Sequence, residues 1–195
     1  MLVGTGAEVF ATSQGLKIVE PSYFFSQDRW DSLQRVKDRE KSTASQGQAK
    51  QALEPVLVFG TVGALALDRH GNLAAGTSTG GMTNKRYGIV GDSPIIGAGT
   101  YANSHCAVSA TGEGEYFIRF TVARDICFRA EYGDTTVAEA AEEVIHRVLP
   151  PKEGGTGGVI TLDSNGKVAM PFNTEGMYRG YIRADGKPVI AIYTD

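Results

Sequence analysis

Two stretches of the chain alternate apolar segments with turn-forming residues in a way that predicts β-hairpins. Residues 65–77 contain two apolar segments on either side of a glycine-containing connector at 68–72. Residues 159–170 repeat this arrangement around a connector at 163–166. Two similar hairpins indicate paired sheet strands and not an array of repeats.

Between the hairpins, apolar residues at helical spacing predict two amphipathic helices. Residues 115–130 carry an apolar side chain at every fourth position, at Ile118, Val122 and Ile126. Residues 137–148 form a second stripe, which Thr136 and Glu139 precede as a capping box and Pro150 terminates. Each helix has one apolar face, so each is expected to lie on a sheet. The strands outnumber the helices enough to predict more than one sheet layer.

Residues 1–60 have a different character. Residues 23–36 mix aromatic and polar side chains and predict a helix, whereas residues 37–51 are almost wholly polar and predict a mobile linker. An apolar run then begins at Pro55 and continues beyond residue 60 into the first hairpin. The expected arrangement is a flexible tether that leads directly into a strand at Thr61.

Composition places the chain among ordinary soluble proteins of one domain. It has 195 residues, of which 42% are hydrophobic and 21% charged. The net charge of −3 argues against a nucleic-acid partner. No apolar run approaches the roughly 18 residues of a membrane helix, so we expect no membrane partner and a cytoplasmic location. The two cysteines are expected to be free buried thiols, because a chain of this size does not need a disulfide.

The familiar catalytic systems are not visible. The three histidines have no metal-ligand or triad spacing, and His70 and His146 are expected at the surface. The chain has no zinc pattern, P-loop or dinucleotide fingerprint, so we expect no cofactor and no metal. Thr61 follows a glycine where polar linker meets apolar strand, and two interpretations stay open. It is either an edge-strand threonine or a nucleophile whose own α-amine, with a pKa of about 7.7–8.0, acts as base once the Gly60–Thr61 bond is cut.

Five segments resemble the plant-type asparaginase and isoaspartyl peptidase family of N-terminal-nucleophile hydrolases. They are residues 60–63 (GTVG), 76–85 (GTSTGGMTNK), 90–102 (VGDSPIIGAGTYA), 109–115 (SATGEGE) and 171–177 (PFNTEGM). The resemblance is almost continuous from Thr61 to Asp195. It implies an α+β fold of the four-layer αββα sandwich type, with residues 1–60 as the end of an α segment, residues 61–195 as the β segment, and both in one domain. It also implies a homodimer of cleaved units.

The resemblance implies a role for individual residues. Thr61 would be the nucleophile, freed by cleavage after Gly60, and Thr79 would hydrogen-bond its hydroxyl group. Thr111 and the backbone N–H of Gly112 would form the oxyanion hole. Asp92 and the carbonyl of Gly114 would hold the α-ammonium of a small-molecule or dipeptide substrate.

Two features depart from the family pattern. The family has an arginine three residues before Asp92 that binds the substrate α-carboxylate, but this chain has Ile89, which cannot make charged bidentate hydrogen bonds. Arg86 either reaches the pocket in its place or is solvated. The family's chains also begin about a hundred residues earlier, with a strand, helices and a sodium-binding loop. The sequence therefore resembles a truncated precursor with exposed sheet edges, which favour association.

The leading hypothesis is an enzyme that hydrolyses β-aspartyl amide bonds, in isoaspartyl dipeptides and L-asparagine, through a threonyl ester. A glycosylasparaginase-like amidase is the alternative within the enzyme class. A non-catalytic remnant is the alternative outside it.

Overall fold

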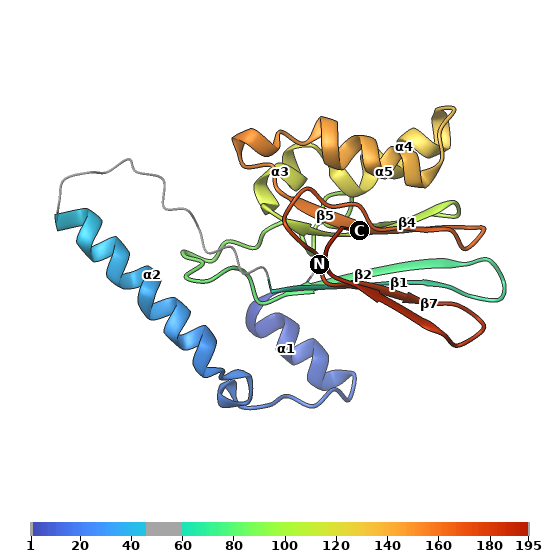
Figure 1. Ribbon diagram of the computed structural model, residues 1–195. Helices are drawn as coiled ribbons and strands as arrows, with labels where there is room; N and C mark the ends of the chain where they lie inside the picture. The colour runs from blue at the N-terminus through green and yellow to red at the C-terminus, as the bar shows by residue number, and fades with distance from the viewer. Residues whose placement is uncertain (1, 46–59, 195) are drawn as a thin grey trace. The chain divides into compact units, whose positions relative to one another are not determined.

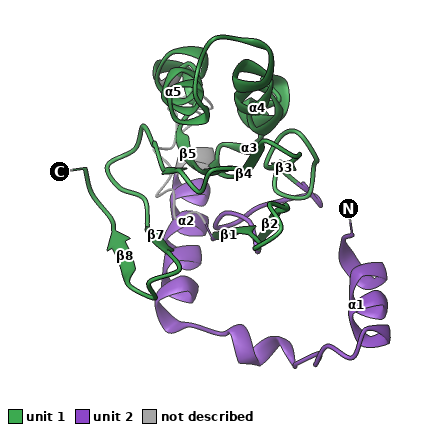
Figure 2. Ribbon diagram, turned by 90° about the vertical axis from the view of Figure 1, so that its right-hand side faces the viewer, with its two compact units in different colours: residues 1, 61–79, 91–195 green, residues 2–60, 80–90 purple. Residues whose placement is uncertain are grey.

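The computed structural model describes residues 2–45 and 60–194, and they divide into two compact units (Figure 2). Unit 1 contains residues 61–79 and 91–194. Unit 2 contains the described residues of Leu2–Gly60 together with Gly80–Val90. Helices and antiparallel sheets both contribute, which confirms the α+β class. Among the described helices, none has the length and apolar character needed to cross a membrane.

The first hairpin of unit 1 has the expected form. Strands β1 (Thr61–Leu67) and β2 (Leu73–Thr79) pair in antiparallel register, with Thr61 opposite Thr79. Burial alternates along both strands, so that every second residue faces inward. In the turn, hydrogen bonds from the side chain and backbone of Asn72 hold the pKa of Asp68 below its ordinary value. The hairpin prediction is therefore confirmed, and hydrogen bonds to the Asp68 carboxylate close its turn.

A four-stranded sheet in the order β3-β4-β5-β6 forms the centre of unit 1. Its strands are β3 (Thr100–Ala102), β4 (Cys106–Gly112), β5 (Gly157–Asp163) and β6 (Val168–Ala169). Figure 1 shows helices α3 (Gly114–Arg119), α4 (Val122–Tyr132) and α5 (Val137–Glu143) on one side of this sheet and the β1–β2 hairpin on the other. The helix-facing residues of β4 belong to the main hydrophobic core. The second predicted hairpin, β5–β6, is also confirmed.

The helix expected over residues 115–130 is two helices. Helix α3 (Gly114–Arg119) ends before Thr121, which has a left-handed backbone (φ 45°), and α4 (Val122–Tyr132) begins directly after it. The first N–H groups of α4 donate to the carbonyls of Ala98 and Gly97, at 3.1 and 2.9 Å. These hydrogen bonds connect segments far apart in the sequence, so periodicity along the chain gives no sign of the break.

The second predicted helix is confirmed, with one change at its end. Helix α5 (Val137–Glu143) begins with the expected capping box, in which Thr136 and Glu139 bond each other's backbone N–H groups. The next residues, Val144–Val148, form a π-helical turn, and a short 3₁₀ turn (Pro151–Glu153) follows. The buried side chains of α4 and α5 pack in the same core as β4 and β5.

In unit 2, the polar linker prediction is wrong where the structure describes it. The elements are α1 (Gly4–Ser13), a 3₁₀ turn (Pro21–Phe24) and α2 (Gln27–Ser45). Helix α2 thus includes the predicted helix and continues into the polar stretch. Long, straight side chains have high helix propensity, and Asp38 and Lys41 pair at i,i+3, so a wholly polar segment is helical without an apolar face. Residues 46–51 and the apolar run at 55–59 lie outside the described residues.

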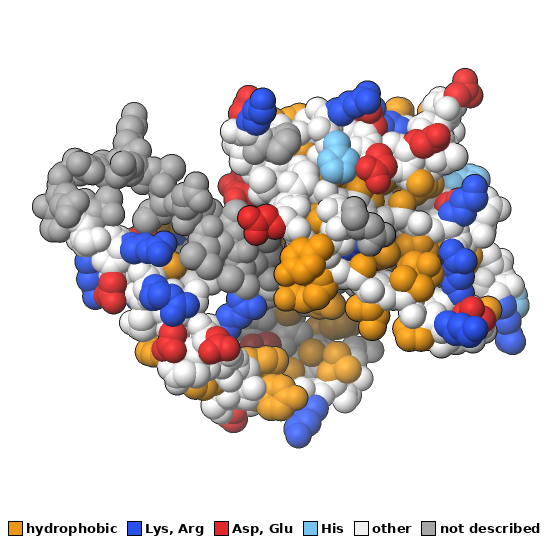
Figure 3. Space-filling view, in the orientation of Figure 1, with side chains coloured by type: hydrophobic (Ala, Val, Ile, Leu, Met, Phe, Trp, Pro, Cys, Tyr) orange, Lys and Arg blue, Asp and Glu red, His pale blue; other side chains and the backbone are white. Residues whose placement is uncertain are grey.

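The last hairpin of unit 1 borders a long apolar groove. Strands β7 (Arg179–Ile182) and β8 (Pro188–Ala191) pair only with each other among the described strands. A groove of about 890 Å³ lies between β7 and β1. Its apolar lining includes Leu65, Leu67, Ile160, Leu162 and Tyr181. Figure 3 shows apolar side chains, in orange, gathered over this part of unit 1.

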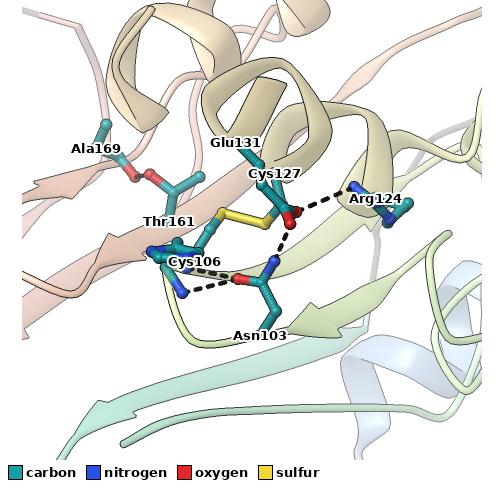
Figure 4. The surroundings of a disulfide bond; sticks show 8 residues. Asn103, Cys106, Arg124, Cys127, Glu131, Thr161 and Ala169 are labelled. Atoms are coloured by element: carbon teal, nitrogen blue, oxygen red, sulfur yellow. Dashed lines mark hydrogen bonds and ion pairs between the residues drawn. A yellow bond between two sulfur atoms is a disulfide. The ribbon is translucent and has the colours of Figure 1, made fainter. Parts of the chain in front are cut away.

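The expectation of free thiols is wrong, because Cys106 on β4 and Cys127 on α4 form a disulfide (Figure 4). Both residues are completely buried at the contact between helix and sheet, and their Cα atoms are 5.5 Å apart. Cysteine count and chain length carry no information about this pairing across the core. At the edge of the same contact, Glu131 accepts a hydrogen bond from Asn103.

We expect the disulfide to stabilise unit 1 by about 3 kcal/mol, since the loop that it closes spans 21 residues. For a chain of this size, that corresponds to a decrease in Tm of roughly 6–12 °C when the bond is absent. The measurement compares oxidised protein with protein refolded in reductant, which keeps every side-chain atom and loses only the bond. Equal melting temperatures would show that the disulfide adds no stability.

Candidate active site

The two threonines at the open end of the first hairpin are in direct contact. Thr61 begins β1 and Thr79 ends β2, and both face inward. The Thr61 hydroxyl donates to Oγ1 of Thr79 at 3.3 Å. The strand register therefore places a second hydroxyl beside the candidate nucleophile, as the resemblance implied.

Thr111 reaches the same place from β4. Thr61 and Thr111 line one cavity of about 260 Å³, which Ser109 and Arg179 also border. The next residue, Gly112, has φ 155°, and a methyl group there would lie 2.4 Å from the carbonyl oxygen of Thr156. Only glycine fits this backbone, which directly follows Thr111.

Asp92 is buried in a turn of unit 1, with 5% of its surface exposed. Its backbone carbonyl accepts from the N–H groups of Ile95 (2.8 Å) and Gly99 (3.2 Å). A methyl group on Gly99 would lie 2.7 Å from Oδ2 of Asp92, and one on Gly114 would lie 2.9 Å from Oδ1. Two glycines thus leave the space that the carboxylate occupies, and the structure brings Asp92 and Gly114 together.

Ile89 and Arg86 belong to unit 2. Ile89 is 64% exposed. The guanidinium of Arg86 forms an ion pair with Glu40, whose other oxygen accepts from Asn84 at 2.9 Å. Arg86 is thus half of an ion pair within unit 2, and its role at the substrate pocket stays a prediction.

Sequence reasoning did not single out Asn173, whose side chain bonds three backbone groups. Its Oδ1 accepts from the N–H of Gly157 at 2.8 Å, and its Nδ2 donates to the carbonyls of Ile145 and Gly155. Gly157 is the strand partner of Gly112, so Asn173 fixes the strand beside the candidate oxyanion hole. Its position within the matched PFNTEGM segment was the available signal.

Sequence reasoning also did not single out the hydroxyls of Thr77 and Ser109. They lie on the inward faces of β2 and β4, two residues before Thr79 and Thr111 respectively. The available signal was the recurrence of a small polar residue at every second strand position.

The histidines lie where the sequence placed them, away from Thr61. His70 is exposed in the hairpin turn, and His146 pairs with Glu142 one helical turn earlier. Within the described ranges, no three His, Cys, Asp or Glu side chains converge as metal ligands. The polar side chains that line the cavity are the hydroxyl groups of Thr61, Ser109, Thr111 and Tyr178 and the guanidinium of Arg179.

Comparison with known proteins identifies the family of the chain. The chain matches the family described as Asparaginase over residues 1–192. It is 47% identical to an isoaspartyl peptidase of Escherichia coli and 47% identical to one of Salmonella typhimurium, with all of the chain covered. It is 40% identical to a plant-type L-asparaginase of Pyrobaculum calidifontis over 96% of the chain. The family match and these relatives show that the protein belongs to the asparaginase family.

The chain spans about 60% of the length of the curated relatives that it matches. It covers 60% of the E. coli and P. calidifontis proteins and 62% of the S. typhimurium protein.

The glycine beside Asp92 gives the first test of this geometry. We expect Gly99→Ala to lower the free energy of unfolding by about 1–3 kcal/mol, because the new methyl group overlaps the buried carboxylate. Gly76→Ala is the matched control, since a methyl group there meets no atom within 4 Å. The control is expected to be neutral or slightly stabilising. Equal effects of the two substitutions in urea unfolding would contradict the close packing at Asp92.

Proposed function

We propose that the protein hydrolyses β-aspartyl amide bonds, in isoaspartyl dipeptides and L-asparagine, through an ester on Thr61. The observation that carries this proposal is the 3.3 Å contact between the Thr61 and Thr79 hydroxyls at a cavity shared with Thr111. The names of the relatives, isoaspartyl peptidase and L-asparaginase, support the substrate class.

The first proposed step is self-cleavage. The Thr61 hydroxyl attacks the carbonyl carbon of Gly60, and the acyl group moves from the Thr61 nitrogen to its oxygen. Water then hydrolyses the ester, which leaves a carboxylate on Gly60 and a free α-amine on Thr61. That amine, with a pKa of about 7.7–8.0, is partly neutral near pH 7.5 and can accept the proton of its own hydroxyl.

The second proposed step is attack on the substrate. The Thr61 oxygen bonds to the β-carbonyl carbon while the α-amine takes the proton, and Thr111 and the Gly112 N–H stabilise the negative oxygen. The proton then passes to the leaving amine, and the C–N bond breaks. Water hydrolyses the aspartyl ester and restores Thr61. The scheme requires only side chains, backbone N–H groups and water.

In this proposal, Asp92 and the carbonyl of Gly114 hold the substrate α-ammonium. The buried carboxylate of Asp92 offers the ammonium group a charged hydrogen-bond acceptor. The α-carboxylate has a weaker site, because Ile89 stands in the position of the family arginine.

Several expectations from the resemblance stay predictions. These are the four-layer αββα sandwich, the union of residues 1–60 and 61–195 in one domain, the homodimer of cleaved units and the cytoplasmic location.

Self-cleavage is tested by the intact mass of the folded protein. We expect two pieces of 60 and 135 residues, and we expect Thr61→Ala to stay one chain because it has no attacking hydroxyl. Thr79→Ala should cleave slowly and turn over substrate much less, since only the partner hydroxyl is removed. A single full-length mass for folded wild-type protein would reject the proposal.

The effect of Ile89 on substrate binding is tested by introducing the arginine that the family has at this position. We expect Ile89→Arg to raise kcat/KM for β-aspartyl dipeptides by roughly tenfold to a hundredfold, because a charge-assisted bidentate hydrogen bond contributes about 1.5–3 kcal/mol. Asp92→Ala in that background should abolish the gain.

Ile18→Arg is the matched control, because it adds the same charge at another exposed isoleucine of unit 2. An equal gain in the control would attribute the effect to net charge. No gain at position 89 would indicate either a substrate without a free α-carboxylate or that Arg86 already binds that group.

A further inference from the structure

Beneath the Thr61–Thr79 pair lies a second layer of hydroxyl groups. In the β1–β2 register, Gly63 is opposite Thr77, one step inward along the same face as Thr61 and Thr79. Oγ1 of Thr77 lies 2.6 Å from Oγ of Ser109 on β4. Ser109 is 3% exposed and precedes Thr111 by two residues on the same face of its strand. Each residue of this layer is thus two positions from a residue of the proposed active site.

The position of Ser109 depends on the absence of a side chain at Gly63. A methyl group on Gly63 would lie 2.1 Å from Oγ of Ser109 and 2.8 Å from its Cβ. Atoms that are not bonded to each other cannot lie this close. Any other residue at 63 would therefore push β1 away from β4. The hairpin and the central sheet are in close contact here, two residues from the candidate nucleophile.

The hydroxyls form a chain with a definite direction. Thr77 donates its only proton to the carbonyl oxygen of Gly99, at 3.0 Å. Oγ1 of Thr77 can therefore only accept from Ser109, so the order runs from Ser109 to Thr77 to Gly99. The same Gly99 carbonyl also accepts from the N–H of Ala110 at 2.9 Å.

Gly99 connects this chain to the buried carboxylate. Its N–H donates to the carbonyl of Asp92 at 3.2 Å, and its Cα packs against the Asp92 side chain. The polar chain therefore begins at β4, crosses to β2 and ends at the turn that holds Asp92. These hydrogen bonds connect β2, the strand of Thr79, to the turn that contains Asp92.

We propose that Thr77 and Ser109 are positioning residues that set the distance from Thr61 to both the oxyanion site and the ammonium site. The inference rests on the proposed function, because it concerns the geometry of that reaction. Ser109 holds β2 at a fixed distance from β4, which aligns Thr61 with Thr111. Thr77 adds the connection to Gly99, which aligns the Asp92 turn with the same strand.

The direction of the chain predicts different effects for its two members. Ser109→Ala removes one bond but leaves Thr77 donating to Gly99, so kcat should decrease about tenfold while KM stays near the wild-type value. Thr77→Val keeps the shape and removes both bonds, so kcat should decrease by a similar or larger factor and KM should also increase. Displacements of about 1 Å at an active site reduce rates by up to about a hundredfold.

Three further variants separate positioning from general destabilisation. Thr77→Ser restores the hydroxyl and should recover most of kcat and KM. The double variant Thr77→Val/Ser109→Ala should be little worse than Thr77→Val, because both changes remove the same bond. Thr161→Val is the matched control: Thr161 is also a buried strand threonine, and its hydroxyl donates to the carbonyl of Ala169 at 3.0 Å on the side of Cys106 and the helices (Figure 4).

The decisive comparison is made with the cleaved protein and a β-aspartyl dipeptide, with Tm measured for each variant. We expect Thr161→Val to lower Tm without changing KM. The inference is overturned if Thr77→Val keeps wild-type kinetics, or if Thr161→Val changes kcat and KM as much for the same loss of Tm. Ser109→Ala and Thr77→Ser carry the test if Thr77→Val does not fold.

Crystal structures of the same variants separate this inference from the proposed function. If wild-type protein neither cleaves itself nor hydrolyses a β-aspartyl bond, the proposed function fails. The positions of Gly99 and Asp92 then decide the inference alone. They should move in Thr77→Val and stay fixed in Thr161→Val. Unchanged positions in both variants would overturn it.

Discussion

The close approach of β1 to β4 at Gly63 is the constraint on which the candidate active site depends. Ser109 occupies the space where a side chain at position 63 would be, so the hairpin can lie flat against the central sheet only with glycine there. Because strand residues alternate, the same approach that brings Gly63 to Ser109 brings Thr61 towards Thr111 two residues further along. The geometry of the nucleophile is thus a consequence of sheet packing.

Strand β4 combines two kinds of packing on its two faces. The face towards the helices is apolar, and the disulfide to α4 joins it to that layer. The face towards the hairpin carries Ser109 and Thr111. A strand fixed on one side by an apolar core and a covalent bond can hold hydroxyl groups in defined positions on the other, which is what a site built on rigid elements requires.

Much of unit 1 could be predicted from sequence because its signals are local. The connector at 68–72 contains the residues that close a hairpin, and Thr136 with Glu139 specifies the start of α5 within four residues. The threonines of the site followed from a family resemblance and not from periodicity. The contact between Thr61 and Thr79 then followed from a register that the hairpin turn fixes.

Two of the errors have a different cause, which is contact between segments distant in sequence. The break at Thr121 depends on carbonyls of residues 97 and 98, and the disulfide depends on the alignment of α4 over β4. The polar stretch after residue 36 was misjudged because low hydrophobicity was taken as disorder. Straight, charged side chains are compatible with helix, and α2 extends through them to Ser45.

In the proposed reaction the base belongs to the nucleophilic residue itself, and this changes what the fold must provide. A serine–histidine pair needs a third group to orient the base. Here the α-amine is attached to Cα and the hydroxyl to the neighbouring Cβ of the same residue. The fold therefore has to set only two quantities, the rotamer of Thr61 and the distance from its oxygen to the oxyanion donors. Thr79 restricts the first by hydrogen bonding, and the packing of β1 on β4 restricts the second. A site of this kind depends more on the exactness of strand packing than on acid–base partners. Its most sensitive positions are therefore expected among the glycines and small hydroxyl residues where β1 packs on β4.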